Sequence, residues 1–176
     1  MESSGSASRS LVWSKLPNRS PREYTLKEGD TIVARLTWQK QLGSLAVGES
    51  AHGSWSFKRT GFLASRLTVR NTGSNEDLVE FRPFLSGGGK LKMRDGRSWE
   101  LKAQGLFSQS YVMLDELYRQ VLSLNVNGMD PRGELSFGPA KPDEKTAHLL
   151  AMLCWYVAML SSDDAETVSL LTILIS

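Results

Sequence analysis

The sequence contains few of the residues from which catalytic and metal-binding sites are most often built. Its 176 residues include one cysteine and two histidines. A single cysteine excludes an internal disulfide framework and any cysteine-rich zinc module. Two histidines leave little material for acid–base chemistry. We therefore expect a protein that binds a partner without catalysing a reaction and that carries no cofactor.

Long apolar segments and a strong net charge are also missing. The longest apolar segment, Ala147–Leu160, has 14 residues, whereas a membrane-spanning helix needs about 20. The first eight residues are rich in serine and lack the apolar run of a signal peptide. We expect a disordered tail over 1–8 and a cytoplasmic location. The formal net charge of +2 is too small to indicate nucleic-acid or membrane binding by itself.

This small net charge hides a separation of charge along the chain. Lys58–Lys102 contains ten basic and five acidic residues, whereas 141–176 contains two basic and five acidic residues. Such separation favours an anionic partner for the middle segment. The alternative is a set of solvated strand faces, on which lysine and arginine oppose aggregation.

Apolar and polar residues alternate through most of the chain after residue 10. Ser54–Lys58, Arg66–Arg70 and Lys90–Arg94 alternate strictly, as strands with one buried face do. Asp95-Gly96 suits the turn of a hairpin. Further strands are expected at Leu11–Trp13, Thr31–Trp38, Ser44–Val47, Leu78–Phe84, Ser98–Ala103, Ser110–Leu114, Arg119–Val126, Glu134–Phe137 and Val168–Ile175.

One segment departs from this alternation, because Ala147–Leu160 is apolar at every position except His148. Pro142, followed by two acids, is typical of a helix N-terminus, and Ser161–Asp164 is expected to end the helix. The sequence therefore predicts a helix over about 143–160.

A helix that is apolar on all sides must be surrounded by other elements. Short strands can surround it as a barrel, which needs more than the eight strands whose own side chains fill the interior. We predict a mainly β fold in a single domain over 9–176. Its core is a closed antiparallel β-barrel of about twelve strands that encloses the hydrophobic C-terminal α-helix.

Several short motifs resemble the tubby C-terminal-like superfamily. They are Trp55–Arg59 with Gly61-Phe62, Leu67–Arg70, Phe81–Pro83, and Asp95–Arg97 with Trp99. Within the superfamily, the sequence is most similar to the phospholipid-scramblase and LURP-one-related branch, including its short uncharacterised members. The resemblance extends from about Leu11 to the C-terminus and implies the same tubby-like barrel around a hydrophobic helix.

The resemblance also implies a function, because tubby-type members bind phosphoinositide headgroups through a basic groove. It implies a non-enzymatic module that binds an anionic ligand, such as a phospholipid or phosphoinositide headgroup, at the periphery of a membrane. The candidate ligand-binding residues are the basic residues Lys58, Arg59, Arg70, Arg82, Lys90 and Lys92.

Scramblase-like members carry an acidic calcium-binding segment near the C-terminal helix, and Asp163, Asp164 and Glu166 lie at a comparable place. These three residues lack the alternating ligand pattern and the turn glycine of a calcium loop. We expect them to cap the helix and solvate the turn, and we predict no metal site.

Two other functions fit the sequence. A barrel that binds a protein partner is nearly as consistent with the sequence as a lipid-binding barrel. Nucleic-acid binding requires exposed aromatic rings, and the tryptophans are expected to be buried.

His52 is expected in an exposed loop, and His148 in the core or at the barrel mouth. Cys154 is expected to be buried and inert.

Overall fold

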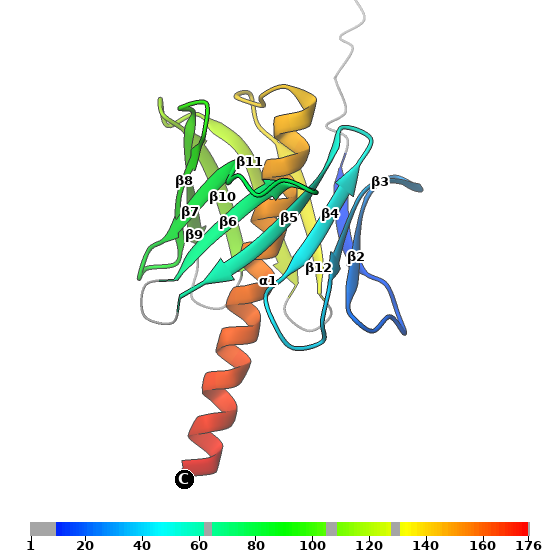
Figure 1. Ribbon diagram of the computed structural model, residues 1–176, viewed down its shortest axis with the longest axis vertical. Helices are drawn as coiled ribbons and strands as arrows, with labels where there is room; N and C mark the ends of the chain where they lie inside the picture. The colour runs from blue at the N-terminus through cyan, green and yellow to red at the C-terminus, as the bar shows by residue number, and fades with distance from the viewer. Residues whose placement is uncertain (1–9, 62–64, 105–108, 128–130, 176) are drawn as a thin grey trace, which may run out of the picture.

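The computed structural model describes residues 10–61, 65–104, 109–127 and 131–175 and shows a closed antiparallel barrel of twelve strands (Figure 1). Each strand pairs with its neighbours in sequence, and β1 pairs with β12 to close the barrel. The strands are β1 (Leu11–Lys15), β2 (Glu23–Glu28), β3 (Thr31–Trp38), β4 (Ala46–Ser50), β5 (Gly53–Thr60), β6 (Arg66–Asn71), β7 (Val79–Pro83), β8 (Gly88–Met93), β9 (Ser98–Gln104), β10 (Gln109–Asp115), β11 (Gln120–Asn127) and β12 (Arg132–Phe137).

A single long helix, α1 (Glu144–Ile175), follows β12 and passes through the barrel (Figure 1). Each residue from Leu149 to Leu160 exposes 6% of its surface or less. The predicted fold class is therefore confirmed: a mainly β, closed antiparallel barrel encloses the hydrophobic C-terminal helix. The predicted tail over 1–8 lies outside the described residues.

Aromatic side chains fill the space between α1 and the barrel wall. The rings of Trp155 and Trp13 stack with their centroids 5.4 Å apart, and those of Tyr156 and Trp38 stack at 5.5 Å. A Cβ at Gly133 on β12 would lie 2.4 Å from the Trp155 ring. The wall therefore needs a glycine where the largest helix side chain approaches it.

The predicted hairpin around Asp95-Gly96 is confirmed. It joins β8 to β9 with Leu91 opposite Trp99, and Gly96 has a φ of 94°, which glycine adopts without strain. All five tryptophans are buried, as expected.

Two sequence predictions about the strands are wrong. The strand β2, Glu23–Glu28, was not predicted, and the strand predicted at Val168–Ile175 is the last part of α1. A strand at Val168–Ile175 would have no partner, because β1 and β12 pair with each other and leave no free edge.

The predicted end of the helix is also wrong, because α1 continues through Ser161–Asp164 to Ile175. Serine and aspartate lower the stability of a helix interior by only a few tenths of a kcal/mol each. The hydroxyl of Ser161 donates to the carbonyl of Val157, 3.0 Å away, so this side chain bonds within the helix that it was expected to end.

The helix distinguishes the two ends of the barrel. We call the end where α1 begins the entry end; it carries the β2–β3, β4–β5, β6–β7, β8–β9 and β10–β11 connections. We call the opposite end, where α1 leaves, the exit end (Figure 1). Among the residues that the structure describes, the exit-end connections hold Arg19, Arg22 and Lys40 and no acid, whereas the five entry-end connections named above hold five acids and three bases.

Candidate functional site

The hairpin of β7 and β8 presents a basic outer face. Phe81 and Leu91 point into the barrel and are buried, so the alternating Arg82, Lys90 and Lys92 point outward and are exposed. Three of the six predicted ligand-binding residues are therefore brought together on one hairpin.

One pair of like charges faces across this hairpin, because Arg82 lies directly opposite Lys90, an unfavourable arrangement by itself. Lys92 lies opposite Glu80, and Lys90 lies opposite Glu100 of β9 on its other side. Arg82 pairs with Glu80 of its own strand, and Glu80 also accepts a hydrogen bond from Arg66 at 3.3 Å. Lys90 and Lys92 have no ion-pair partner within the described residues.

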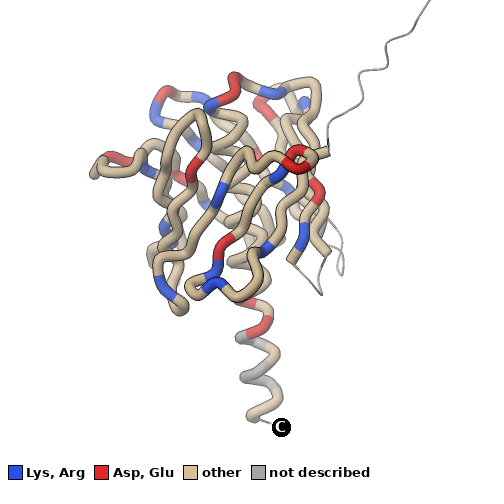
Figure 2. The backbone as a smooth tube through the Cα atoms, turned by 90° about the vertical axis from the view of Figure 1, so that its right-hand side faces the viewer, with Lys and Arg blue, Asp and Glu red and all other residues tan. Residues whose placement is uncertain are grey.

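A shallow groove of about 540 Å³ runs over this face. Four of its lining residues are basic and two are acidic: Arg82, Lys90, Lys92 and Arg94 against Asp77 and Glu80. On the side wall that Figure 2 shows, basic and acidic positions are interspersed over the barrel. The β7–β8 groove is the place where three of the six predicted basic residues converge.

The other three predicted residues lie elsewhere. Lys58 is exposed on β5, two strands away. Arg70 hydrogen-bonds Asp77 at 2.6 Å. Arg59 points to the exit mouth of the barrel, where it donates to Asp164 of α1 at 2.6 Å. The sequence showed that these residues are basic, but it could not show that Arg59 faces the helix instead of the groove.

Arginines at the exit mouth hold α1 in the barrel. Both amino groups of Arg22 bond the carboxylate of Asp163, and the Arg22 guanidinium lies 4.3 Å from the centre of the Trp38 ring. Burial alone would lower the pKa of Arg22, but its hydrogen bonds with Asp163 raise it above its usual value. The Tyr156 hydroxyl donates to the carbonyl of Ser44, 2.5 Å away. The helix is thus anchored where it leaves the barrel.

This anchoring involves two of the three calcium candidates. The carboxylates of Asp163 and Asp164 bond arginines of the barrel rim, and Glu166 is exposed further along α1. Figure 2 shows acidic positions on α1 directly below the barrel. Carboxylates that already neutralise two guanidinium groups are poor calcium ligands, so Asp163 and Asp164 make a structural contact with the barrel.

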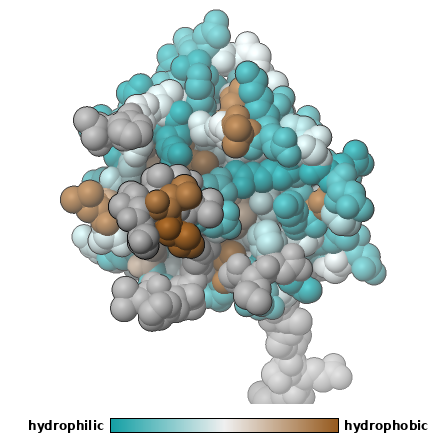
Figure 3. Space-filling model, turned by 90° about the horizontal axis from the view of Figure 1, so that it is seen from below, coloured by the Kyte–Doolittle hydropathy of each residue, from teal (hydrophilic) through white to brown (hydrophobic). Residues whose placement is uncertain are grey.

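The exit end also exposes large apolar side chains. Leu42 is 89% exposed, and Leu85 at the tip of the β7–β8 hairpin is fully exposed beside Phe84. Ile173 and Leu174, near the end of α1, are 70% and 81% exposed. Figure 3 views this end and shows separate hydrophobic patches in a largely hydrophilic surface. Among the described residues, no helix is long and apolar enough to cross a membrane.

The two histidines of the chain meet at the entry end. His52 is exposed in the β4–β5 connection, and His148 is largely buried in the second turn of α1. Their ring centroids are 4.7 Å apart. Burial lowers the pKa of His148, and the neighbouring His52 acts in the same direction, so the neutral imidazole is favoured. The positions of both residues fit the sequence predictions, but their contact was not predicted.

Cys154 is fully buried in the middle of the enclosed part of α1. Burial raises the pKa of its thiol far above the ordinary value, and no other cysteine exists in the chain. The side chain therefore acts as a small apolar core residue, as the sequence predicted.

Comparisons of this chain with protein-family models, with curated proteins and with solved structures find no match. The resemblance to the tubby-like superfamily therefore stays a prediction from the motifs.

Proposed function

We propose that this protein is a non-enzymatic module that binds the headgroups of anionic phospholipids, such as a phosphoinositide, through the β7–β8 groove. The observation that carries the proposal is the convergence of Arg82, Lys90 and Lys92 on one hairpin, with two of the three lacking an ion-pair partner in the described part of the chain. The tubby-like resemblance of the motifs supports the same ligand class.

The ends of the barrel suggest how the module meets a membrane. The β7–β8 hairpin carries its basic residues on its flank and Phe84 and Leu85 at its tip, which lies at the exit end. A basic residue close to an anionic membrane contributes about 1 kcal/mol, and an apolar tip adds contacts with the lipid boundary. We propose a cytoplasmic protein that binds peripherally with the outer flank and the tip of the β7–β8 hairpin toward the lipid.

Co-sedimentation with vesicles tests this proposal. The double variant Lys90→Glu/Lys92→Glu should bind vesicles of phosphatidylcholine and phosphatidylserine roughly 30-fold more weakly than the wild type. This factor counts only the loss of two contributions of about 1 kcal/mol each and is therefore a lower limit, because the anionic surface also repels the two new carboxylates. Both side chains are exposed, so the midpoint of thermal unfolding should hardly change.

The matched control is Lys27→Glu/Lys58→Glu, which changes the net charge by the same amount on other strands. We expect this variant to keep most of the binding. Equal losses in the two variants would show that net charge, and not the groove, attracts the vesicles. A wild type that does not sediment with anionic vesicles at low salt would overturn the proposal.

The alternative function is binding of a protein partner by the barrel. A different observation favours it: α1 continues beyond the barrel and exposes Ile173 and Leu174. Capture of a partner that survives the Lys90→Glu/Lys92→Glu exchange but is lost when 167–176 are removed would support this alternative. Nucleic-acid binding by the basic face finds no aromatic platform in the tryptophans, because all five rings are buried.

A further inference from the structure

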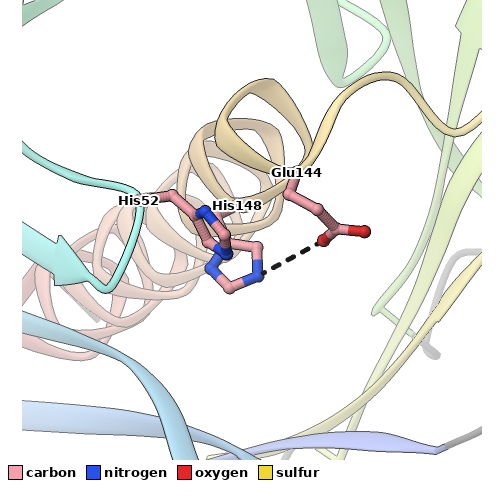
Figure 4. A group of neighbouring side chains, drawn as sticks. All are labelled: His52, Glu144 and His148. Carbon is pink, nitrogen blue, oxygen red and sulfur yellow. Dashed lines mark ion pairs between the residues drawn. The ribbon is translucent and has the colours of Figure 1, made fainter.

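His52, Glu144 and His148 form a cluster at the entry end that the lipid-binding proposal does not use (Figure 4). Both histidines of the chain are in it, although 96 positions separate them in the sequence. Glu144 and His148 are one helical turn apart on α1, and His52 reaches them from the β4–β5 connection. Potential ligand atoms of the three side chains all lie within 4.8 Å of one another.

We propose that His52, Glu144 and His148 bind a divalent transition-metal ion, of which zinc fits best. Two imidazole nitrogens and one carboxylate oxygen are a ligand set that zinc accepts, with a water molecule in the fourth position. Hard cations such as calcium prefer six or more oxygen ligands, and this cluster offers one carboxylate. The site is independent of the β7–β8 groove.

The distances are close to those of a bound site. Ligand bonds of about 2.0–2.1 Å in a tetrahedron place neighbouring ligand atoms about 3.3 Å apart. Nε2 of His148 and Oε2 of Glu144 are already 3.9 Å apart. His52 and Glu144 are exposed, so rotation of their side chains can bring the ligand atoms to this separation. His148 is held on the helix beside the barrel mouth.

The charges around the cluster both favour and oppose a cation. Glu144 supplies the negative charge, and its other oxygen, Oε1, accepts a hydrogen bond from Lys141 at 2.6 Å. Lys141 leaves Oε2 free to face the histidines, but its positive charge lowers the affinity for a metal ion. The N-terminus of α1 acts in the same direction. Removing the charge of Lys141 should therefore strengthen binding.

A purely structural role explains only part of the arrangement. Residues 144 and 148 form an ordinary ion pair across one helical turn, and this pair does not require His52. Nδ1 of His148 is buried and has no hydrogen-bond partner within the described residues, which is unusual for a buried polar atom. A metal ion held by Nε2 of His148 would explain why His52 lies against this imidazole, but it would not supply a partner for Nδ1.

Titration of the metal-free protein with Zn²⁺, followed by calorimetry, tests the proposal. We expect one ion per chain and a rise of several degrees in the unfolding midpoint when the site is saturated, because the ion binds only the folded state. His52→Ala and Glu144→Gln should each weaken binding by more than the roughly 10- to 100-fold that loss of an outer-sphere partner costs. Both side chains are exposed, so the variants should fold.

Two further variants give the controls. Glu49→Gln removes an exposed acid near the same barrel end and should leave zinc binding unchanged. Lys141→Met should tighten it. Absence of binding at micromolar Zn²⁺ by the folded wild type would overturn the proposal, as would affinity that is unchanged in His52→Ala. Equal weakening by Glu49→Gln would show general attraction of cations to an acidic surface.

Discussion

The two halves of α1 belong to one continuous helix but lie in opposite surroundings. From Leu149 to Leu160 the helix is buried on every side, whereas from Ser161 onward its described side chains are mostly exposed. The inner half has no polar side, because barrel strands surround it. The outer half begins with two aspartates that bond arginines of the barrel rim. The helix therefore changes its role where it passes Arg22 and Arg59.

This contrast shows how tertiary contacts can stabilise a helix whose residues have only a modest intrinsic helix propensity. The inner half contains tryptophan, tyrosine and valine, which are mediocre helix formers, and its stability comes from tertiary packing. The outer half has no barrel wall around it and is held only at its base.

The strongest test of the contrast places a charge in each half. Leu153→Asp puts an unpaired carboxylate on the barrel axis, where Leu153 is fully buried, and should cost about 4 kcal/mol or more. Leu174→Asp makes the same exchange at a position that is 81% exposed and should change stability very little. Circular dichroism during thermal unfolding measures both. A folded Leu153→Asp protein of normal stability would mean that the barrel does not enclose the helix.

A second test acts on the boundary between the halves. Arg22→Ala removes the paired hydrogen bonds to Asp163 and the contact with the Trp38 ring, and should cost about 2 kcal/mol in urea unfolding. The control is Arg35→Ala, which breaks a pair with Glu23 in which Arg35 is well exposed and should cost less than about 1 kcal/mol. If both variants lost the same free energy of unfolding, the partly buried pair of Arg22 and Asp163 would be no more important than an exposed one.

The smallest expected change in stability comes from the charge of Asp143, which lies just before α1 begins. Hydrogen bonds from Thr146 lower the pKa of Asp143, with a further contribution from Arg97, so the charged carboxylate stabilises the folded state. Since the folded pKa is the lower one, this contribution is present above about pH 4 and is lost as the pH falls through the folded pKa.

Asp143→Asn keeps a capping side chain but removes the charge. It should cost less than about 1 kcal/mol at pH 7, because the carboxylate is exposed. Unfolding of both proteins between pH 7 and pH 2 measures the difference, which should vanish at the acid end. A difference that is independent of pH would show that the charge of Asp143 is not involved.

Much of the barrel could be predicted because alternation is a local property. Strands such as Lys90–Arg94 show their buried face in every second residue, and the apolar run after Ala147 requires an enclosure. The strand Glu23–Glu28 was missed because only Tyr24 and Leu26 mark its inner face, and charged residues surround them. The end of the helix could not be predicted, because it depends on the pairing of β1 with β12.

The candidate sites needed more than local patterns. Alternation places Arg82 and Lys90 on an outer face, but only the register shows that they lie opposite each other. The meeting of His52 with His148 had a usable signal in the sequence. Eight strands were predicted between these residues, and an even number of antiparallel strands returns the chain to the same end of a barrel. The bond of Arg59 with Asp164 had no such signal.

The threading of α1 through the barrel has a consequence for the order of folding. The helix that fills the core follows all twelve strands in the chain, and the strand that closes the barrel, β12, pairs Leu135 with Leu11 near the beginning. The closing pair cannot form until the chain has been synthesised beyond Phe137, and the enclosed part of α1 is complete only after Leu160. During synthesis the inward faces of the strands stay open to water, so folding is late and dominated by contacts that are distant in sequence.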